Sequence, residues 1–261
     1  MRFTTICSGS SGNCVYINGG RTHVLVDGGC SLKTLRLALA QLKVDESSLD
    51  AILITHEHSD HVKGAARIAK RFSIPLYASE RTWENLPFRE DFLRWEQHKF
   101  DYGMEIGDLG LDFFRLSHDA IQPVGLVFDY LGQRVGVATD TGMVTPSMQR
   151  LLMNIDGLIF EANHCIDMLR RGPYPYHLKQ RILSDKGHLS NIQAGMALRG
   201  LLGARSQAVL LAHLSHINNE SQLAYDQVLA QLKDSPHLSH VQITVAPRYA
   251  PHPLIQLEPN D

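Results

Sequence analysis

Thr55-His56-Glu57-His58-Ser59-Asp60-His61 is the stretch that decides the fold of this chain, because it places four side chains of metal-ligand type within six positions. Before it runs Ala51–Ile54, a short apolar segment typical of a buried strand. After it, the pattern predicts a helix over His61–Phe72. Between a buried strand and a helix, a loop of this composition is typical of a cation site rather than of a solvated surface loop.

The geometry of this loop divides the four side chains into two pairs. Side chains of an extended segment alternate between its two sides, so His56 and His58 point the same way. If the helix begins near Asp60, then Asp60 and His61 project from its first turn toward the same cavity. The loop can therefore serve two cations, one from each pair.

Three further candidates, His118, Asp140 and His213, stand at the ends of β-type runs farther along the chain. Each alone is more typical of a structural residue. Together with the loop they supply five imidazoles and two carboxylates, one of which can bridge, and this is what two divalent cations need. Asp27 ends the run His23–Val26 before two glycines, and we expect it to orient a ligand or the loop backbone.

The rest of the chain indicates two similar β-rich halves with helices outside them. The first half includes a helix at Ser31–Leu42 with Ser31 as its N-cap, and the second half repeats the order of strands and helices. These elements predict an α/β fold, a four-layer αββα sandwich that forms one domain over residues 1–261. The other expected strands and helices are Arg2–Cys7, Val15–Asn18, His23–Val26, Leu109–Leu116, Val124–Tyr130, Val135–Ala138, Gly157–Phe160, Ala208–Ala212 and Val241–Val245, and Met148–Met153, Ile192–Leu202 and Glu220–Leu232.

The composition is that of a globular protein without a strong overall charge. Of 261 residues, 44% are hydrophobic and 20% are charged, and 25 basic against 27 acidic side chains leave a net charge of −2. This argues against a protein that coats nucleic acid, but not against an enzyme that acts on it. The four cysteines follow no regular framework, as is typical of free thiols in a cytoplasmic protein. No apolar run is long enough to predict a membrane span, and no obligate protein partner is indicated.

The order of these motifs resembles that of the metallo-β-lactamase fold over nearly the whole chain. The resemblance implies two sets of metal ligands that share one bridging residue: His56, His58 and His118; Asp60, His61 and His213; and Asp140 between them. A bridging aspartate is similar to the phosphodiesterase and nuclease branches of that fold. Two divalent ions, Mn²⁺ or Zn²⁺, suit these ligands, and the resemblance slightly favours Mn²⁺ because the ligand motifs contain no cysteine.

Further segments resemble the YycJ/WalJ group within that fold. They are Ser8-Gly9-Ser10-Ser11-Gly12-Asn13, Glu161-Ala162-Asn163-His164, Met168-Leu169, Tyr174-Pro175, Leu178-Lys179 with Arg181-Ile182, and Gly187-His188-Leu189-Ser190-Asn191. Cys165 departs from the pattern, since many members carry Asp there. The group consists of metal-dependent hydrolases with 5′-to-3′ exonuclease activity on DNA. The resemblance therefore implies a two-metal hydrolase of phosphodiester bonds that acts on DNA.

Glu161 and His188 resemble the glutamate and histidine that ribonuclease Z and its relatives use beside the metals. A carboxylate that is hydrogen-bonded to an imidazole fixes its tautomer and keeps it protonated, ready to donate a proton to a leaving oxygen. We therefore expect Glu161 and His188 to act in catalysis together with Asp60.

Two segments are candidates for substrate contacts. The glycine-rich turn around Ser10 and Asn13 can present N–H groups to an anion, although alone it is typical of a β-turn. Over residues 170–188, five cations face one carboxylate, and this run either contacts a polyanion or forms a solvated basic face. Its candidate contacts are Arg170, Arg171, Lys179 and Arg181.

Two other functions stay open at this point. A hydrolase of small phosphodiesters, thioesters or lactams uses the same metals, because the metal chemistry does not encode substrate size. A binding module that keeps the fold without turnover is the other alternative, but such a module has no need of an open two-metal site.

Overall fold

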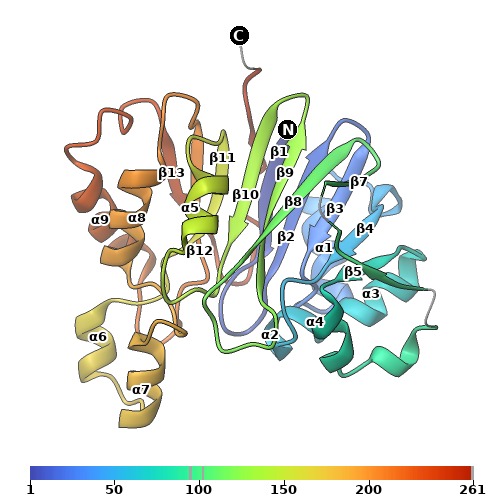
Figure 1. The fold of residues 1–261 in the computed structure, drawn as a ribbon, viewed down its shortest axis with the longest axis horizontal. Coiled ribbons are helices and arrows are strands. Elements are labelled where there is room, and N and C mark those ends of the chain that lie inside the picture. The colour runs from blue at the N-terminus through green and yellow to red at the C-terminus, as the bar shows by residue number, and fades with distance from the viewer. Residues whose placement is uncertain (94–95, 102, 260–261) are drawn as a thin grey trace.

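Two β-sheets face each other at the centre of the molecule, and helices cover the outer face of each (Figure 1). The computed structural model describes residues 1–93, 96–101 and 103–259, and within them each sheet has seven strands. The first sheet has the order β14-β1-β2-β3-β4-β5-β6, with β1 Arg2–Cys7, β2 Cys14–Gly19, β3 Thr22–Val26, β4 Ala51–Leu53, β5 Leu76–Ala78, β6 Gln97–Lys99 and β14 Ile255–Gln256. The second has the order β13-β12-β11-β10-β9-β8-β7, with β7 Met104–Ile106, β8 Leu109–Arg115, β9 Val124–Tyr130, β10 Gln133–Ala138, β11 Gly157–Glu161, β12 Ala208–Ala212 and β13 Gln242–Val245. The expected four-layer αββα sandwich is confirmed.

The expected helices are present, but one of them is divided, and three further α-helices, at Glu80–Asn85, Ile166–Arg171 and Tyr176–Leu183, were not expected. They are α1 Leu32–Gln41, α2 Ser59–Val62, α3 Ala65–Phe72, α4 Glu80–Asn85, α5 Pro146–Leu152, α6 Ile166–Arg171, α7 Tyr176–Leu183, α8 Asn191–Leu201 and α9 Ser221–Leu232, with short 3₁₀ turns at Glu46–Ser48 and Arg89–Asp91. The segment that carries α6 and α7 was not expected to be helical; it projects from the lower left of the molecule in Figure 1. Among the described residues, no helix is both long and apolar enough to cross a membrane.

The single helix expected over His61–Phe72 is wrong: it is interrupted between α2 and α3. The interruption lies at Gly64, where the loop after β3 passes very close. A Cβ atom on Gly64 would lie 1.9 Å from the carbonyl oxygen of Cys30, so no larger residue fits there. The break lets the Gly28–Cys30 loop support α2, and the N–H of Gly28 donates to the carbonyl of His61 at 2.7 Å.

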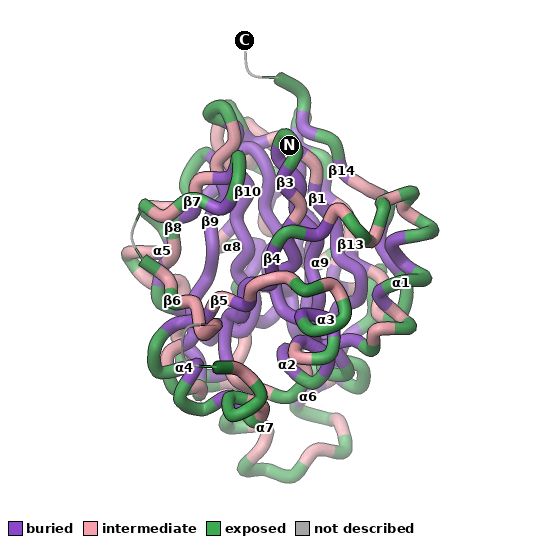
Figure 2. Tube along the Cα trace, turned by 90° about the vertical axis from the view of Figure 1, so that its right-hand side faces the viewer, coloured by how far each residue is buried: buried purple, intermediate pink, exposed green. Residues whose placement is uncertain are grey.

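Three apolar layers hold the sandwich together, and Figure 2 shows the strands of both sheets as mostly buried. Successive side chains of a buried strand enter different layers, as the two-residue period of a strand requires. In β12, Leu210 joins the core between the sheets, whereas Val209 and Leu211 join the core beneath α8 and α9. In β4, Leu53 faces the second sheet and Ile52 packs under α1 and α3. These strands are buried on both faces, and this explains why their sequences are continuous apolar runs.

The strand register brings the ends of several strands to one level. In the second sheet, β10, β11 and β12 are parallel, with Ala138 beside Phe160 and Phe160 beside Leu211. In the first sheet, β3 and β4 are parallel, with Val26 beside Leu53. The residues that follow these strands therefore meet at the same end of the sandwich, where loops at the carboxyl ends of parallel strands form sites.

Candidate metal centre

Three of the expected site residues leave their strands in the left-handed backbone conformation. The φ angles of Asp27, Asp140 and His213 are 62°, 63° and 57°, although none of them is glycine. This conformation costs a non-glycine residue about 1–3 kcal/mol and persists where the surrounding structure enforces it. It turns the chain sharply at the ends of β3, β10 and β12 and places the three side chains at the end of the sandwich.

The structure gathers the ligand-type side chains into the two groups into which the resemblance divides them. The first group is His56, His58 and His118, and the second is Asp60, His61 and His213. Within each group, the nitrogen or oxygen atoms that could bind a metal lie within 4.8 Å of one another. Asp140 lies between the groups. Its Oδ2 is 3.2 Å from His61 Nε2, and its Oδ1 is 3.3 Å from His213 Nε2 and 3.8 Å from His118 Nε2.

Hydrogen bonds orient the imidazoles of the first sheet through Asp27. Its carboxylate accepts a hydrogen bond from His61 Nδ1 at 2.7 Å and another from the Thr55 hydroxyl at 2.9 Å. Because that hydroxyl donates to Asp27, it accepts from His56 Nδ1, 3.0 Å away. Both rings therefore carry their proton on Nδ1 and present Nε2 to the centre, which is the arrangement that metal-binding histidines require.

The second sheet orients its imidazoles in the same way. His118 Nδ1 donates to the carbonyl of Gly187 at 3.1 Å, and His213 Nδ1 donates to Glu161 Oε1 at 3.1 Å. Glu161 Oε1 also accepts from His188 Nδ1 at 2.7 Å, and Oε2 accepts the backbone N–H groups of Thr141 and Leu189. The buried Glu161 carboxylate thus fixes two imidazoles at once.

The charges of the site are strongly coupled. Burial alone would raise the pKa of Asp140, but the imidazoles of His213 and His61 hold it well below its usual value. Burial likewise opposes ionisation of Glu161, yet His188 lowers the pKa of Glu161 to about 2. The same contact outweighs burial at His188 and raises the pKa of its imidazole. Glu161 is therefore an anion that favours a protonated His188.

These residues fit divalent cations. His56 Nε2, His213 Nε2 and Asp140 Oδ2 are buried and have no hydrogen-bond partner among the described residues. Buried polar atoms without partners are costly unless they coordinate a metal. Imidazole nitrogens and carboxylate oxygens, with no thiolate among them, form a donor set that suits Mn²⁺ or Zn²⁺.

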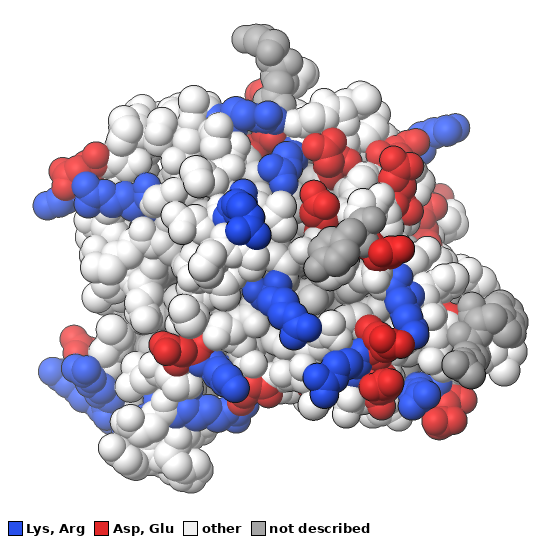
Figure 3. Space-filling model, viewed as in Figure 1, with Lys and Arg blue, Asp and Glu red and all other residues white. Residues whose placement is uncertain are grey.

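A small cavity of about 140 Å³ opens beside His188. Two of the residues expected to contact substrate, Ser10 and Arg181, line it together with Tyr174, Asn163 and Ser215. Arg170, Arg171 and Lys179 are not among the described residues that line it; the Lys179 ammonium donates to the carbonyl of Arg170 and ties α7 to α6. Figure 3 shows basic side chains gathered at the lower left, over α6 and α7.

Asn13, the other expected substrate contact, lies beneath the metal centre. Its side-chain amide donates to Asp60 Oδ2 at 3.1 Å and lies 3.0 Å from His61 Nε2. Asn13 is buried, so its amide holds candidate ligands in position rather than facing the open cavity.

Two further residues lie near the centre, although neither was expected to have a role of its own there. Asn163 donates its side-chain amide to the carbonyl of His213 at 2.9 Å, although the two lie 50 positions apart in the sequence. Asp119 lies 3.2 Å from His118 Nε2 and also pairs with Arg181. The signal for Asp119 was its position directly after His118, and that for Asn163 was the segment Glu161-Ala162-Asn163-His164, which does not reveal the contact with His213.

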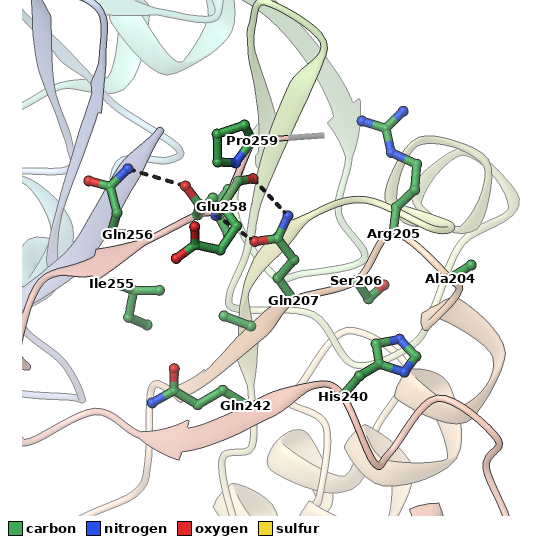
Figure 4. A pocket seen from close by; sticks show the side chains of 12 residues that line it. Ala204, Arg205, Ser206, Gln207, His240, Gln242, Ile255, Gln256, Glu258 and Pro259 are labelled. Carbon is green, nitrogen blue, oxygen red and sulfur yellow. Dashed lines mark hydrogen bonds between the residues drawn. The ribbon is translucent and has the colours of Figure 1, made fainter. Parts of the chain in front are cut away.

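A larger cavity, of about 660 Å³, lies at the other end of the sandwich, at the start of β12 and β13 (Figure 4). Its lining includes Gln207, Gln242 and Glu258 but none of the expected site residues among those the structure describes. Gln207 and the backbone of Glu258 bond each other twice, at 2.8 and 3.1 Å. These two residues therefore satisfy each other's polar groups, in contrast to the unpartnered atoms of the metal centre.

Comparison with known proteins agrees with the site geometry. Residues 22–214 match the model of the β-lactamase superfamily domain. Exodeoxyribonuclease WalJ of Streptococcus pneumoniae is 40% identical over 237 residues, covering 89% of this chain and 88% of that protein. Exodeoxyribonuclease YycJ of Bacillus anthracis is 35% identical over 243 residues, covering 90% of each.

A solved structure carries the same fold at lower identity. The metallo-β-lactamase fold protein YhfI of Bacillus subtilis superposes with a TM-score of 0.67 at 19% identity, covering 96% of this chain and 98% of that one. Together with the family match and the two relatives, this confirms the resemblance that the motifs indicated. The chain belongs to the β-lactamase superfamily, as a WalJ/YycJ-like protein with the metallo-β-lactamase fold.

Proposed function

We propose that this protein is an exonuclease that hydrolyses phosphodiester bonds of DNA in the 5′-to-3′ direction with two divalent metal ions, Mn²⁺ or Zn²⁺. The observation that carries the proposal is the pair of buried His/Asp groups with Asp140 between them. The two relatives, each aligned with about nine-tenths of this chain, are named exodeoxyribonucleases, and this supports DNA as the substrate. A small-molecule hydrolase and a binding module without turnover are not favoured by these relatives.

In this proposal each of the two groups named above would hold one ion, and Asp140 would be a ligand shared by both groups. What two such cations supply is a water of lowered pKa and neutralisation of negative charge that develops on phosphoryl oxygens. Asp60 is partly open, with 23% of its side chain exposed, so its carboxylate can both bind an ion and orient the attacking water. Asp27, Thr55 and Glu161 keep the imidazoles in one tautomer, so that no rotation precedes the reaction.

His188 is the proposed general acid. Its Nδ1 is held by Glu161, its Nε2 has no hydrogen-bond partner in the part of the chain that the structure describes, and 18% of its side chain is exposed beside the cavity. The alkoxide that leaves when DNA is cleaved needs a proton, and the Glu161 carboxylate favours the imidazolium that supplies it. Glu161 thus acts through His188 and does not itself touch the substrate.

Ser10 and Arg181 lie at the cavity beside His188, where they can contact a phosphate of the bound strand. Arg170, Arg171 and Lys179 lie outside the cavity, on the helices that project beside it, and they would contact phosphates farther along the strand. We also propose that the chain acts as one domain, because the first sheet supplies His56 and His58 and the second supplies Asp140 and His213 to one centre. Its four buried, unpaired cysteines support a reducing, cytoplasmic location.

The proposal is tested with purified protein loaded with Mn²⁺ or Zn²⁺. We expect mononucleotides to be released from linear DNA, with a label at the 5′ end appearing in product before a label at the 3′ end. Closed circular DNA of the same sequence should resist, and the Asp140→Ala protein is the matched control for contaminating nucleases. Hydrolysis of an aryl phosphodiester without degradation of DNA under either metal would refute the nuclease and favour a small-molecule hydrolase.

A further inference from the structure

Asp119 bridges the candidate metal centre and the cavity beside it. Its Oδ1 lies 3.2 Å from His118 Nε2, and its Oδ2 accepts a hydrogen bond from the Nε–H of Arg181 on α7. The side chain is 28% exposed at the rim of the cavity that Arg181 and His188 also line. One carboxylate therefore has each of its oxygens directed at a different functional group.

The contact with His118 requires a positive charge between the two side chains. Because His118 Nδ1 donates its proton to the carbonyl of Gly187, Nε2 of the neutral ring carries a lone pair. A lone pair and a carboxylate oxygen 3.2 Å apart repel each other unless a proton on Nε2 or a metal ion lies between them. His118 Nε2 is the nitrogen that His118 offers to the group it forms with His56 and His58, so Asp119 Oδ1 lies at the edge of that group, on the side of His118.

The contact with Arg181 restricts a long and otherwise exposed side chain. Arg181 has 56% of its side chain exposed, and α7 has no buried residue that would hold it rigidly against the sandwich. The ion pair with Asp119 engages the Nε–H of the guanidinium, and none of the described residues bonds its other N–H groups. A planar guanidinium held in this way suits bidentate recognition of a phosphate.

We propose that Asp119 is a further ligand of the metal ion held by His118 and, through its other oxygen, the positioning residue that fixes Arg181 for a phosphate of the substrate. The second part rests on the proposed function, whereas the first does not. Substrate binding and metal binding then share the Asp119 carboxylate. Removing that carboxylate weakens both kinds of binding, whereas removing Arg181 weakens only substrate binding.

The metal part is tested by titrating the chelator-treated full-length protein with Mn²⁺ and measuring free Mn²⁺ by its electron paramagnetic resonance signal. Asp119→Asn is expected to weaken binding of one of two ions by roughly 10–100-fold, the range found when groups that support a metal are removed. Asp119→Glu, which keeps the charge, should recover part of that affinity. Arg181→Met should leave both affinities unchanged, as should Arg171→Met, the matched control on the neighbouring helix. Two unchanged Mn²⁺ affinities in the Asp119→Asn protein would overturn this assignment.

The positioning part is tested by a double-mutant cycle on the affinity for a single-stranded oligonucleotide, measured with Ca²⁺ in place of the active metal. Arg181→Met should weaken DNA binding in the unmodified chain but have an effect at least about twofold smaller in the Asp119→Asn background, because residues in contact are energetically coupled. Equal effects in both backgrounds would show that Asp119 does not position Arg181. If the protein binds no DNA while Mn²⁺ binding responds as described, the proposed function fails but the ligand assignment stands.

Discussion

The Nδ1 atom of His188 lies 2.7 Å from Oε1 of Glu161. That same oxygen accepts a hydrogen bond from His213, a candidate metal ligand, at 3.1 Å. The proposed acid catalyst and the metal centre therefore depend on one buried carboxylate. A change at His188 removes only the proton donor, whereas a change at Glu161 affects both functions, and this difference can be measured.

His188→Ala should retain both metal ions and lose proton donation. The rate on DNA, whose alkoxide leaving group needs a proton, should fall by roughly 10²–10⁴. A nitrophenyl phosphodiester should be affected much less, because nitrophenolate leaves without a proton. The rates on the two esters, together with metal content, check this. Equal losses on both esters, or loss of a metal ion, would show that His188 has another role.

Glu161→Gln should weaken metal binding as well as slow the reaction. Glu161 holds His188 for acid catalysis, and its hydrogen bond to His213 adds the loss of a group that orients a candidate metal ligand. Such losses reduce metal affinity by about 10–100-fold. Metal titration of Glu161→Gln and of His188→Ala checks this. The metal affinity of His188→Ala should equal that of the unmodified chain, whereas that of Glu161→Gln should be lower. Identical metal affinities in all three proteins would contradict a role of Glu161 at His213.

Asp140→Ala should remove the bridge between the two ligand groups. We expect lower metal content and hydrolysis reduced to background, while the fold survives because the three apolar layers do not include this side chain. His58→Ala, in one group only, should likewise lose an ion and activity. Metal analysis, circular dichroism and hydrolysis check these outcomes. About two ions per chain and full activity in the Asp140→Ala protein would refute the bridging role.

The sequence revealed the parts of the site that depend on local spacing. His56, His58, Asp60 and His61 lie within one loop, so their grouping follows from strand and helix periodicity. It could not reveal contacts made by the packing of distant segments, such as that of Asn163 with His213. Nor does local propensity predict the left-handed backbone of residues such as Asp27 and His213, because that conformation is imposed by the surrounding fold.

The expected fold differs from the structure mainly where local sequence carries little information. Strands buried on both faces were recognised because their apolar runs are continuous, and their order gave the four layers. The break at Gly64 was missed because it depends on the loop that ends at Cys30, which is far away in sequence. Helices α6 and α7 were missed because they have only six and eight residues, so a helical period hardly repeats along either sequence.

The basic side chains of α6 and α7 should govern the salt dependence of DNA binding. Replacing Arg170, Arg171, Lys179 and Arg181 together by Ala should weaken DNA binding and flatten the log–log salt slope by about 0.7–0.9 for each phosphate that the variant no longer neutralises. Lys33→Ala with Arg67→Ala, at exposed positions on α1 and α3, is the control and should leave the slope unchanged. An unchanged slope in the fourfold variant would make this run a solvated basic face.

His164 should make the protein sensitive to acid. It is fully buried, neither ring nitrogen has a hydrogen-bond partner among the described residues, and burial lowers its pKa from 6.5 to about 4. Between about pH 6.5 and pH 4, His164 binds a proton in the unfolded chain but not in the folded chain. Stability therefore falls as the pH falls through this window. The full effect is about 3 kcal/mol.

His164→Phe should remove this dependence, because the phenyl ring has a similar shape and no proton to bind. The free energy of unfolding, measured by denaturant titration in chelator between pH 7 and pH 4, should fall less steeply for this variant than for the unmodified chain. Measuring both in chelator keeps the metal ligands alike in the two proteins, so the difference between the curves isolates His164. His216→Gln, an exposed position, is the control and should follow the unmodified chain. Parallel curves for His164→Phe and the unmodified chain would mean that His164 is protonated as readily in the folded protein as in the unfolded one.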